Sequence, residues 1–367
     1  MNVAFRADAS LQIGAGHVMR CLTLADALQE NGVTCRFICR EYDGHLIDLV
    51  TDRGYPVHAL PRQDEFIQSE TDDLAHARWL GVDWATDAQQ TQHALGDQLV
   101  DWLILDHYAL DYRWGQKLRL LSKKIMVIDD LADRPHQCEL LLDQNLGRQP
   151  QDYANLVPAH CKVLTGPQYA LLRPEFAALR SYSLQRRQQP ALKRVLITMG
   201  GVDQFNVTCQ VLQALRSCAL PQDCCFSVVV GLDSPWLQQV RAVAVDMPWP
   251  TEVLVNISDM AQRMADSDLA IGAAGSTSWE RCCLGLPTLL VVLADNQRFG
   301  ARALQEAQAA LFIGDVSDIS IKLPLAINAS VSQHWLLEMS TVTAAITDGC
   351  GVEKVLKAMR ILDDYAQ

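Results

Sequence analysis

The sequence predicts an α/β protein built from two doubly wound, Rossmann-like domains. Its 367 residues are more than one hydrophobic core comfortably fills, and 49% of them are apolar. Short β-type runs alternate with helix-period stretches in both halves, which is typical of parallel strands covered by helices on both faces. Because ligands bind at the carboxyl ends of such strands, we expect the two domains to face a central cleft.

Residues 1–165 are predicted to form the first domain. Buried strands are expected at Val3–Phe5, Val33–Ile38, Val57–Leu60, Leu103–Leu105, Ile125–Ile128 and Leu140–Leu142. Helix-period apolar positions lie between some of these runs, at Val18–Leu28, His45–Asp52 and Tyr112–Leu121.

The pattern changes over residues 166–190, where Gly166-Pro167 and Arg173-Pro174 precede a polar stretch without a period, and a linker is predicted there. Residues 191–335 are predicted to form a second domain. Its strands are expected at Arg194–Thr198, Phe226–Val230, Glu252–Val255, Leu269–Ile271 and Thr288–Val292, with helices from about Phe205, Trp236, Asp259, Ser278 and Phe299. Residues 336–367 are predicted to be a wholly helical C-terminal segment.

Charge and cysteine spacing exclude several classes of function. A net charge of -12 disfavours nucleic acid and anionic membrane surfaces as partners. The twelve cysteines form no Cys-x-x-Cys pair, so we interpret them as buried thiols in a reducing compartment, with no metal and no cofactor. The longest apolar run, Leu286–Ala294, is far shorter than a membrane span, and a cytoplasmic protein without membrane insertion is expected.

The first motif with chemical content is Gly14-Ala15-Gly16-His17, which follows the first strand and opens a helix. It is not the dinucleotide fingerprint, because Met19 stands where the third glycine belongs. The positive helix start disfavours an imidazolium, so His17 is predicted to stay neutral and to accept a proton as a general base. The alternative is a surface histidine beside a tight turn.

The second motif runs from Leu269 to Glu280, where an apolar strand ends in a small-residue loop before a helix. Gly275, Ser276 and Thr277 are placed to hold a diphosphate, and Glu280 to accept hydrogen bonds from ribose hydroxyls. The alternative is a capping box in which a hydroxyl caps the helix and Glu280 completes the arrangement.

Three smaller features lie at other expected strand ends. Gly200-Gly201 is a second place where backbone meets phosphate, and Asn296-Gln297 offers two amides for sugar hydroxyls. Asp106-His107-Tyr108 ends a buried strand, where a cap on the next turn is as good an interpretation of Asp106 as a catalytic role. Taken singly, each feature is better explained by ordinary loop chemistry.

In this order, the motifs resemble those of the hydrolase family that removes UDP from UDP-2,4-diacetamido-2,4,6-trideoxy-β-L-altropyranose in pseudaminic acid biosynthesis. Outside residues 62–96 and the tail after Leu336, the match runs over nearly the whole chain. It is carried by Phe5–Arg20, Ile104–Tyr108, Ile128–Asp130, Tyr169–Phe176, Met199–Asp203 and Asn296-Gln297.

That family is similar in fold to GT-B glycosyltransferases, which implies that the C-terminal domain holds UDP. The resemblance implies that backbone around Ile257 meets uracil, that Glu280 meets the ribose, and that Gly275–Thr277 meets the diphosphate. It implies that His17 and Tyr108 are the catalytic residues, with His17 as the base and Tyr108 beside it in the sugar pocket. The remaining residues of the predicted substrate site are Arg6, Asp8, Gly14, Gly16, Asp106, Gly200, Gly201, Asn296 and Gln297.

The implied reaction is attack of water on the anomeric carbon, with inversion and release of UDP. One alternative is a GT-B glycosyltransferase with a UDP-sugar donor and a soluble acceptor, since the acidic stretch 64–97 disfavours a lipid acceptor. A nucleotide-sugar epimerase and a non-catalytic sensor of UDP-sugars are the others. A sensor has no need of a base such as His17.

Overall fold

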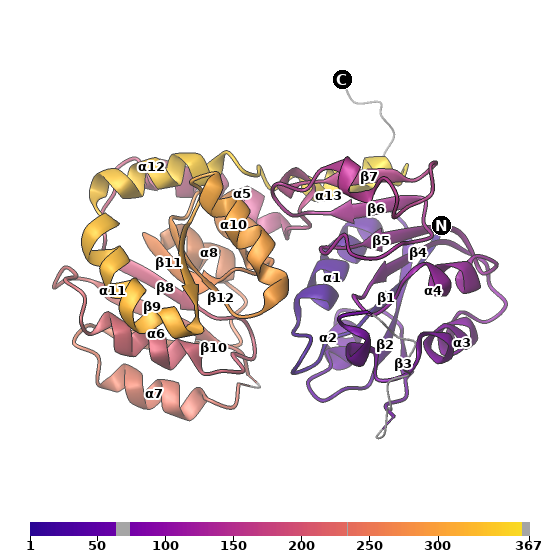
Figure 1. Cartoon of the computed structure of the whole chain (residues 1–367), viewed down its shortest axis with the longest axis horizontal. Coiled ribbons are helices and arrows are strands. Elements are labelled where there is room, and N and C mark those ends of the chain that lie inside the picture. The colour runs from indigo at the N-terminus through magenta and orange to yellow at the C-terminus, as the bar shows by residue number, and fades with distance from the viewer. Residues whose placement is uncertain (64–73, 233, 362–367) are drawn as a thin grey trace. The chain divides into compact units, whose positions relative to one another are not determined.

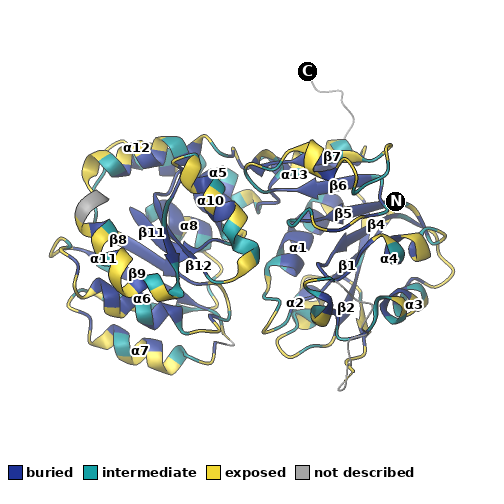
Figure 2. Ribbon diagram, viewed as in Figure 1, coloured by how far each residue is buried: buried dark blue, intermediate teal, exposed yellow. Residues whose placement is uncertain are grey.

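The computed structural model describes residues 1–63, 74–232 and 234–361 and divides the chain into two compact units (Figure 1). Unit 1 comprises residues 1–171 and 351–367, and unit 2 comprises residues 172–350. Each unit is built on one wholly parallel sheet whose central strands are largely buried (Figure 2). The doubly wound α/β class predicted from the sequence is therefore confirmed for both units.

Unit 1 has a seven-stranded sheet in the order β3-β2-β1-β4-β5-β6-β7. Its strands are β1 (Asn2–Ala7), β2 (Thr34–Arg40), β3 (Val57–Leu60), β4 (Val100–Asp106), β5 (Ser122–Ile128), β6 (Leu140–Asp143) and β7 (Lys162–Thr165). Its α-helices are α1 (Gly16–Glu30), α2 (Ile47–Asp52), α3 (Trp84–Leu95), α4 (Tyr112–Leu118) and α13 (Gly351–Ala358), and η1 (Ala77–Leu80), η2 (Pro150–Tyr153) and η3 (Pro167–Tyr169) are 3₁₀ turns.

The two faces of the unit 1 sheet have separate hydrophobic cores because successive strand residues point to opposite sides. Along β4, Trp102 and Ile104 belong to the core that contains the apolar face of α1. Leu103 and Leu105 belong to the core formed with α3 and α4. Strands buried on both faces have continuous apolar sequences, which is why they were recognised without an alternating pattern.

Unit 2 has a six-stranded sheet in the order β10-β9-β8-β11-β12-β13. Its strands are β8 (Arg194–Thr198), β9 (Cys225–Val230), β10 (Thr251–Val255), β11 (Leu269–Ala273), β12 (Thr288–Val292) and β13 (Leu311–Asp315). Its helices are α5 (Pro174–Arg186), α6 (Val207–Leu215), α7 (Leu237–Val245), α8 (Met260–Asp266), α9 (Thr277–Cys283), α10 (Arg298–Glu306), α11 (Ile319–Ser330) and α12 (Gln333–Ala344), with the 3₁₀ turns η4 (Asp295–Gln297) and η5 (Val316–Asp318).

Each sheet has one point where the strand order reverses, between β1 and β4 in unit 1 and between β8 and β11 in unit 2. Loops that leave the carboxyl ends of those strands diverge and leave room for a ligand. The start of α1, which carries His17, and Asp106 at the end of β4 lie at the first switch point. The Gly200-Gly201 turn and the Gly275–Thr277 loop lie at the second.

The predicted linker over residues 166–190 is wrong for most of its length, because Pro174–Arg186 is the helix α5, packed against α8 and α9 within unit 2. Its polar residues are used for hydrogen bonds inside that unit. The buried Arg187 donates to the carbonyl oxygens of Met264, Ser267 and Leu284. The polar sequence of this stretch suggests a solvated linker. In the structure it instead forms the C-terminal end of α5, which hydrogen bonds hold within unit 2.

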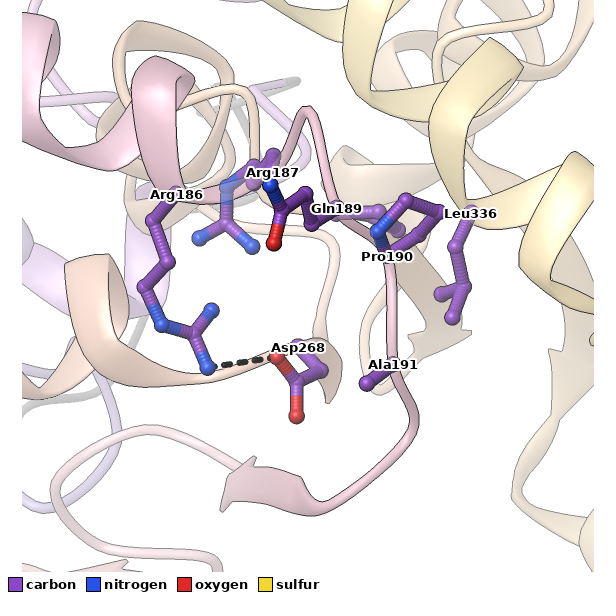
Figure 3. Close-up of a pocket in the computed structure, with 8 residues that line it drawn as sticks. Arg186, Arg187, Gln189, Pro190, Ala191, Asp268 and Leu336 are labelled. Carbon is purple, nitrogen blue, oxygen red and sulfur yellow. Dashed lines mark hydrogen bonds and ion pairs between the residues drawn. The ribbon is translucent and has the colours of Figure 1, made fainter.

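Figure 3 shows a small cavity beside the Arg187 hydrogen bonds, lined in part by Arg186, Asp268 and Leu336. Arg186 Nη2 donates to Asp268 Oδ1 over 2.6 Å. The cavity encloses about 10 Å³, room for no more than one water molecule. Asp268 precedes β11, so the cavity lies at the amino edge of the sheet, opposite the switch point.

The predicted wholly helical tail is also wrong, because α12 ends at Ala344 and the chain turns through Gly349 before α13 begins in unit 1. Gly349 has a φ of +88°, and a Cβ added there would lie 2.7 Å from the Cys283 sulfur. The strands β7 and β13 and the helix α3 were not predicted. Residues 362–367 of the tail lie outside the described residues.

Beneath the unit 1 switch point lies a completely buried network of Arg6, Asp8, Arg40 and Asp87. Arg6 Nη1 and Nη2 lie 2.6 Å from Asp8 Oδ1 and Asp87 Oδ2, and Arg40 Nη2 lies 2.7 Å from Asp87 Oδ2. Burial alone would raise the pKa of Asp87, but the Arg6 guanidinium outweighs it and holds that pKa below its usual range. The network ties β1 and β2 to α3.

Replacing Asp87 by asparagine should therefore destabilise unit 1, because two buried guanidinium groups lose a shared counter-charge. We expect a loss of about 3–5 kcal/mol in the free energy of unfolding, the usual effect of breaking a buried ion pair. Denaturant unfolding followed by circular dichroism measures it. Asp101→Asn is the matched control, since Asp101 pairs with the exposed Lys123 and should cost less than about 1 kcal/mol. Equal losses for the two variants would contradict the prediction.

Candidate active site

Four adjacent strands of unit 1 end in aspartates at the same edge of the sheet. β1 is followed by Asp8 and β5 by Asp129, while Asp106 and Asp143 are the last residues of β4 and β6. All four carboxylates are buried. Because buried carboxylates need partners, the positions of the cations and hydrogen-bond donors around them define the site.

His17 lies at this edge as the second residue of α1. Gly14, with a φ of +79°, turns the chain from β1 into the helix. The imidazole Nδ1 lies 2.6 Å from Asp106 Oδ1, and 9% of the side chain remains exposed. A carboxylate accepts hydrogen bonds, so the Nδ1 position carries the proton and Nε2 of the neutral ring carries the lone pair. This pairing orients His17 as a proton acceptor.

Arg20 holds the same carboxylate from one turn further along α1. Its Nε and Nη2 donate to the two oxygens of Asp106 over 2.6 and 2.7 Å. Arg20 Nη2 also lies 2.8 Å from Asp130 Oδ2, beyond the end of β5. Burial alone would raise the pKa of Asp106, but the Arg20 guanidinium and the His17 imidazole together hold it well below its usual range. Asp106 is therefore ionised when it faces the imidazole.

Tyr108 packs its ring edge-on against His17, with 4.6 Å between ring centroids. Its hydroxyl donates to Asp130 Oδ2 over 2.6 Å. Burial, reinforced by the Asp130 carboxylate, raises the pKa of Tyr108 well above its usual value. The phenol therefore stays protonated with its proton committed to Asp130. Tyr108 lies beside His17, as the resemblance implied, and its place among the catalytic residues stays a prediction.

Two other expectations for this edge are corrected. Arg6 and Asp8 are completely buried in the network described above, so neither side chain reaches a ligand, and we withdraw them from the substrate-binding set. The alternative in which Asp106 caps the next turn is also wrong. His107 Nδ1 accepts from the Ala109 backbone there, and its Nε2 lies 3.3 Å from Asp8 Oδ2.

The predicted phosphate loops of unit 2 meet at its switch point. The Gly200-Gly201 turn follows β8 and approaches Gly231 so closely that a Cβ on Gly231 would lie 2.0 Å from the Gly201 oxygen. Ser276, at the start of α9, makes no side-chain capping bond, so the capping-box alternative is wrong. A Cβ on Gly275 would lie 4.0 Å from Gln297 Nε2, which places the two predicted contact segments side by side.

Glu280 lies on α9, half-buried, with Arg173 Nη2 3.8 Å from its Oε1. Burial raises the pKa of Glu280 to about 7, and Arg173 and Arg281 offset only part of that effect. Ile257 follows β10 and is half-buried. Asn296 belongs to the 3₁₀ turn after β12, where Gln297 Oε1 already accepts from the Leu293 backbone.

Sequence reasoning missed Arg20 and Asp130, although both belong to segments that carry the family resemblance. The spacing from His17 to Arg20 places both on one face of α1, and that signal was available. It also missed His76 and Trp79, which contact Tyr108 from residues that align with nothing recognisable. No sequence pattern connects them to the site.

Within the described ranges, no three His, Cys, Asp or Glu side chains gather in a group that would hold a metal ion. The site carboxylates are instead occupied by guanidinium, imidazole and phenol donors. Among the helices that the structure describes, none is long and apolar enough to cross a membrane.

The chain is similar in fold to GT-B glycosyltransferases. MurG of Acinetobacter baumannii superposes with a TM-score of 0.68 over 98% of this chain and 99% of its own, at 18% identity, which shows the fold alone. Residues 194–341 match the model of the glycosyltransferase family 28 C-terminal domain.

Two curated relatives are similar to this chain over most of its length. The UDP-2,4-diacetamido-2,4,6-trideoxy-β-L-altropyranose hydrolase of Campylobacter jejuni is 27% identical over 81% of this chain and 93% of its own. The spore coat polysaccharide biosynthesis protein SpsG of Bacillus subtilis is 29% identical over 86% of this chain and 84% of its own. The resemblance stated from the motifs is thereby confirmed.

The His17–Asp106 contact makes a prediction that needs no substrate. The neutral His17 ring should carry its proton on Nδ1, because only that tautomer donates to the carboxylate. Nitrogen-15 imidazole chemical shifts measure the tautomer, and His17→Gln identifies the resonance. Asp106→Asn should shift the population toward the Nε2-protonated form. A wild-type ring already protonated on Nε2 would contradict the geometry.

Proposed function

We propose that this protein hydrolyses UDP-2,4-diacetamido-2,4,6-trideoxy-β-L-altropyranose to UDP and the free sugar. The observation that carries the proposal is the His17–Asp106 pair at the unit 1 switch point, in which a partly exposed imidazole is held by a buried carboxylate in the orientation of a proton acceptor. The similarity to the Campylobacter jejuni hydrolase supports the substrate, and the family 28 match supports the nucleotide.

In the proposed reaction, His17 Nε2 removes a proton from water as the water oxygen attacks the anomeric carbon. The bond from that carbon to the β-phosphate oxygen breaks, and its electron pair leaves with UDP. Attack from the face opposite the leaving group inverts the configuration. The imidazolium that forms is stabilised by the ionised Asp106, and Arg20 keeps that carboxylate in place.

Unit 2 would hold the nucleotide. Backbone amides of the Gly200-Gly201 turn and the Gly275–Thr277 loop would bind the diphosphate, and the Glu280 carboxylate would accept hydrogen bonds from the ribose hydroxyls. Backbone near Ile257 would meet the uracil. UDP is a good leaving group, so donors at the diphosphate are enough to stabilise the departing charge, and no metal enters the mechanism.

A second candidate is transfer of the sugar to a soluble acceptor, which the family 28 match in residues 194–341 favours. The two functions differ only in the hydroxyl that His17 activates. The acidic stretch 64–97 was expected to oppose a lipid acceptor, but its residues 64–73 lie outside the described residues. The acceptor is therefore decided by experiment.

The deciding experiment incubates the protein, without any acceptor, with the proposed substrate or with UDP-N-acetylglucosamine. We expect free UDP and free sugar from the first substrate alone. His17→Asn should lower turnover by about 10²–10⁴-fold, the usual contribution of a general base, with UDP affinity unchanged. His160→Ala, at an exposed histidine, is the matched control. Absence of UDP release by the wild-type protein would refute hydrolysis, and near-normal turnover by His17→Asn would refute the assigned base.

The pKa of Glu280 predicts that nucleoside affinity rises with pH. Ribose hydroxyls donate to the ionised carboxylate, and the ionised fraction grows as the pH passes about 7. Between pH 6 and pH 8 we expect uridine to bind up to about tenfold more tightly. Uridine is the probe because it has no phosphate to titrate, and calorimetry gives its affinity.

Glu280→Gln should remove this pH dependence, since the amide does not titrate over that range. Glu175→Gln is the control, because Glu175 also pairs with Arg173 but lies at a more exposed position. An undiminished pH dependence in Glu280→Gln would show that Glu280 does not meet the ribose.

A further inference from the structure

Beside His17, three aromatic side chains form a continuous cluster, which we call the aromatic wall: His76, Trp79 and Tyr108. The indole of Trp79 stacks on Tyr108 at 5.6 Å with 26° between ring planes. His76 lies 4.4 Å from Trp79 and 5.4 Å from Tyr108. Tyr108 contacts the His17 ring, so the wall lies directly beside the proposed base.

The wall is held in place by Tyr42, two residues after the end of β2. The Tyr42 hydroxyl donates to the carbonyl oxygens of Trp79 and Leu80 over 2.9 and 2.5 Å. Gly81 ends the η1 turn with a φ of +66°, and a Cβ there would lie 3.1 Å from the Tyr42 ring. Trp79 and His76 are thus fixed by packing and hydrogen bonds, which a binding surface requires.

Trp79 and His76 keep exposed ring surface and ring nitrogens that could bind a ligand. Trp79 and His76 are only half-buried, in contrast to the buried Tyr108. Within the part of the chain that the structure describes, neither the Trp79 indole N–H nor the His76 ring nitrogens have a hydrogen-bond partner. Desolvation lowers the pKa of His76, which keeps its ring neutral and able to donate or accept. The wall therefore offers apolar ring area together with polar edges.

We propose that Trp79 and His76 determine sugar specificity by binding the apolar parts of an N-acetylated 6-deoxy sugar next to His17. The C6 methyl and acetamido methyl groups would pack on the indole, and the ring nitrogens would bond the acetamido groups. This inference rests on the proposed function, which it deepens by naming residues that distinguish this sugar from one with a C6 hydroxyl. A single such group in an apolar site changes kcat/KM by about 10–200-fold.

The test measures steady-state hydrolysis together with inhibition by each product. For Trp79→Ala we expect KM to rise at least about tenfold and inhibition by the free diacetamido sugar to weaken by a similar factor. Inhibition by UDP should not change, and kcat should stay within about threefold. Trp84→Ala is the matched control, because the Trp84 ring lies against Arg113 and not in the wall.

If the Trp79→Ala variant does not fold, Trp79→Phe and Trp79→Leu test the proposed sugar contact instead. The phenylalanine variant retains a ring and should keep most of the sugar affinity, whereas the leucine variant should lose most of it. Equal KM values for these two variants, or equal weakening of sugar and UDP inhibition, would overturn the proposal. Failure of the wild-type protein to hydrolyse the substrate would instead refute the proposed function on which the wall depends.

Discussion

The Asp106 carboxylate is the group on which the rest of the unit 1 site depends. It is completely buried at the last position of a central strand, and an unpaired charge there would be strongly destabilising. Arg20 neutralises it through two short bonds, and His17 donates a third. Because Arg20 and His17 lie on the same helix, these bonds fix the start of α1 against β4, and the requirement for charge balance also sets the orientation of the imidazole.

The same constraint extends below and beside the site. Arg6 and Arg40 compensate Asp8 and Asp87 beneath it, and Arg20 carries the pairing across to Asp130. Each group in this network of ion pairs is positioned by the charged or polar group beside it. A side chain such as Tyr108 is thus committed to Asp130, while His17 retains one ring nitrogen for chemistry. Dense pairing of this kind makes a rigid site, since moving one member leaves a partner buried and unpaired.

Strands and motif positions were predictable from the sequence because their signals are local. The buried parallel strands have continuous apolar runs, and β3, β8 and β12 were predicted to the residue. The pairing of His17 with Asp106 was not predictable, since 89 residues separate the partners and only the sheet order brings them together. The linker prediction failed for the same reason. The sequence does not show that the guanidinium of the buried Arg187 donates to three backbone carbonyl oxygens. Helix-start electrostatics alone also gave an incomplete account of His17, whose ring faces a carboxylate.

Under the proposed function, the two units would have separate roles. The family 28 match lies within unit 2, and the groups that we propose there would bind the UDP moiety. Unit 1 would then decide the reaction, because the proposed base His17 would activate the hydroxyl that is admitted. In this chain the surroundings of that base include Trp79 and His76, supplied by a segment outside the motifs. If Trp79 and His76 contact the sugar as proposed, specificity would change through this segment without disturbing the pairing of Asp106 with His17 and Arg20.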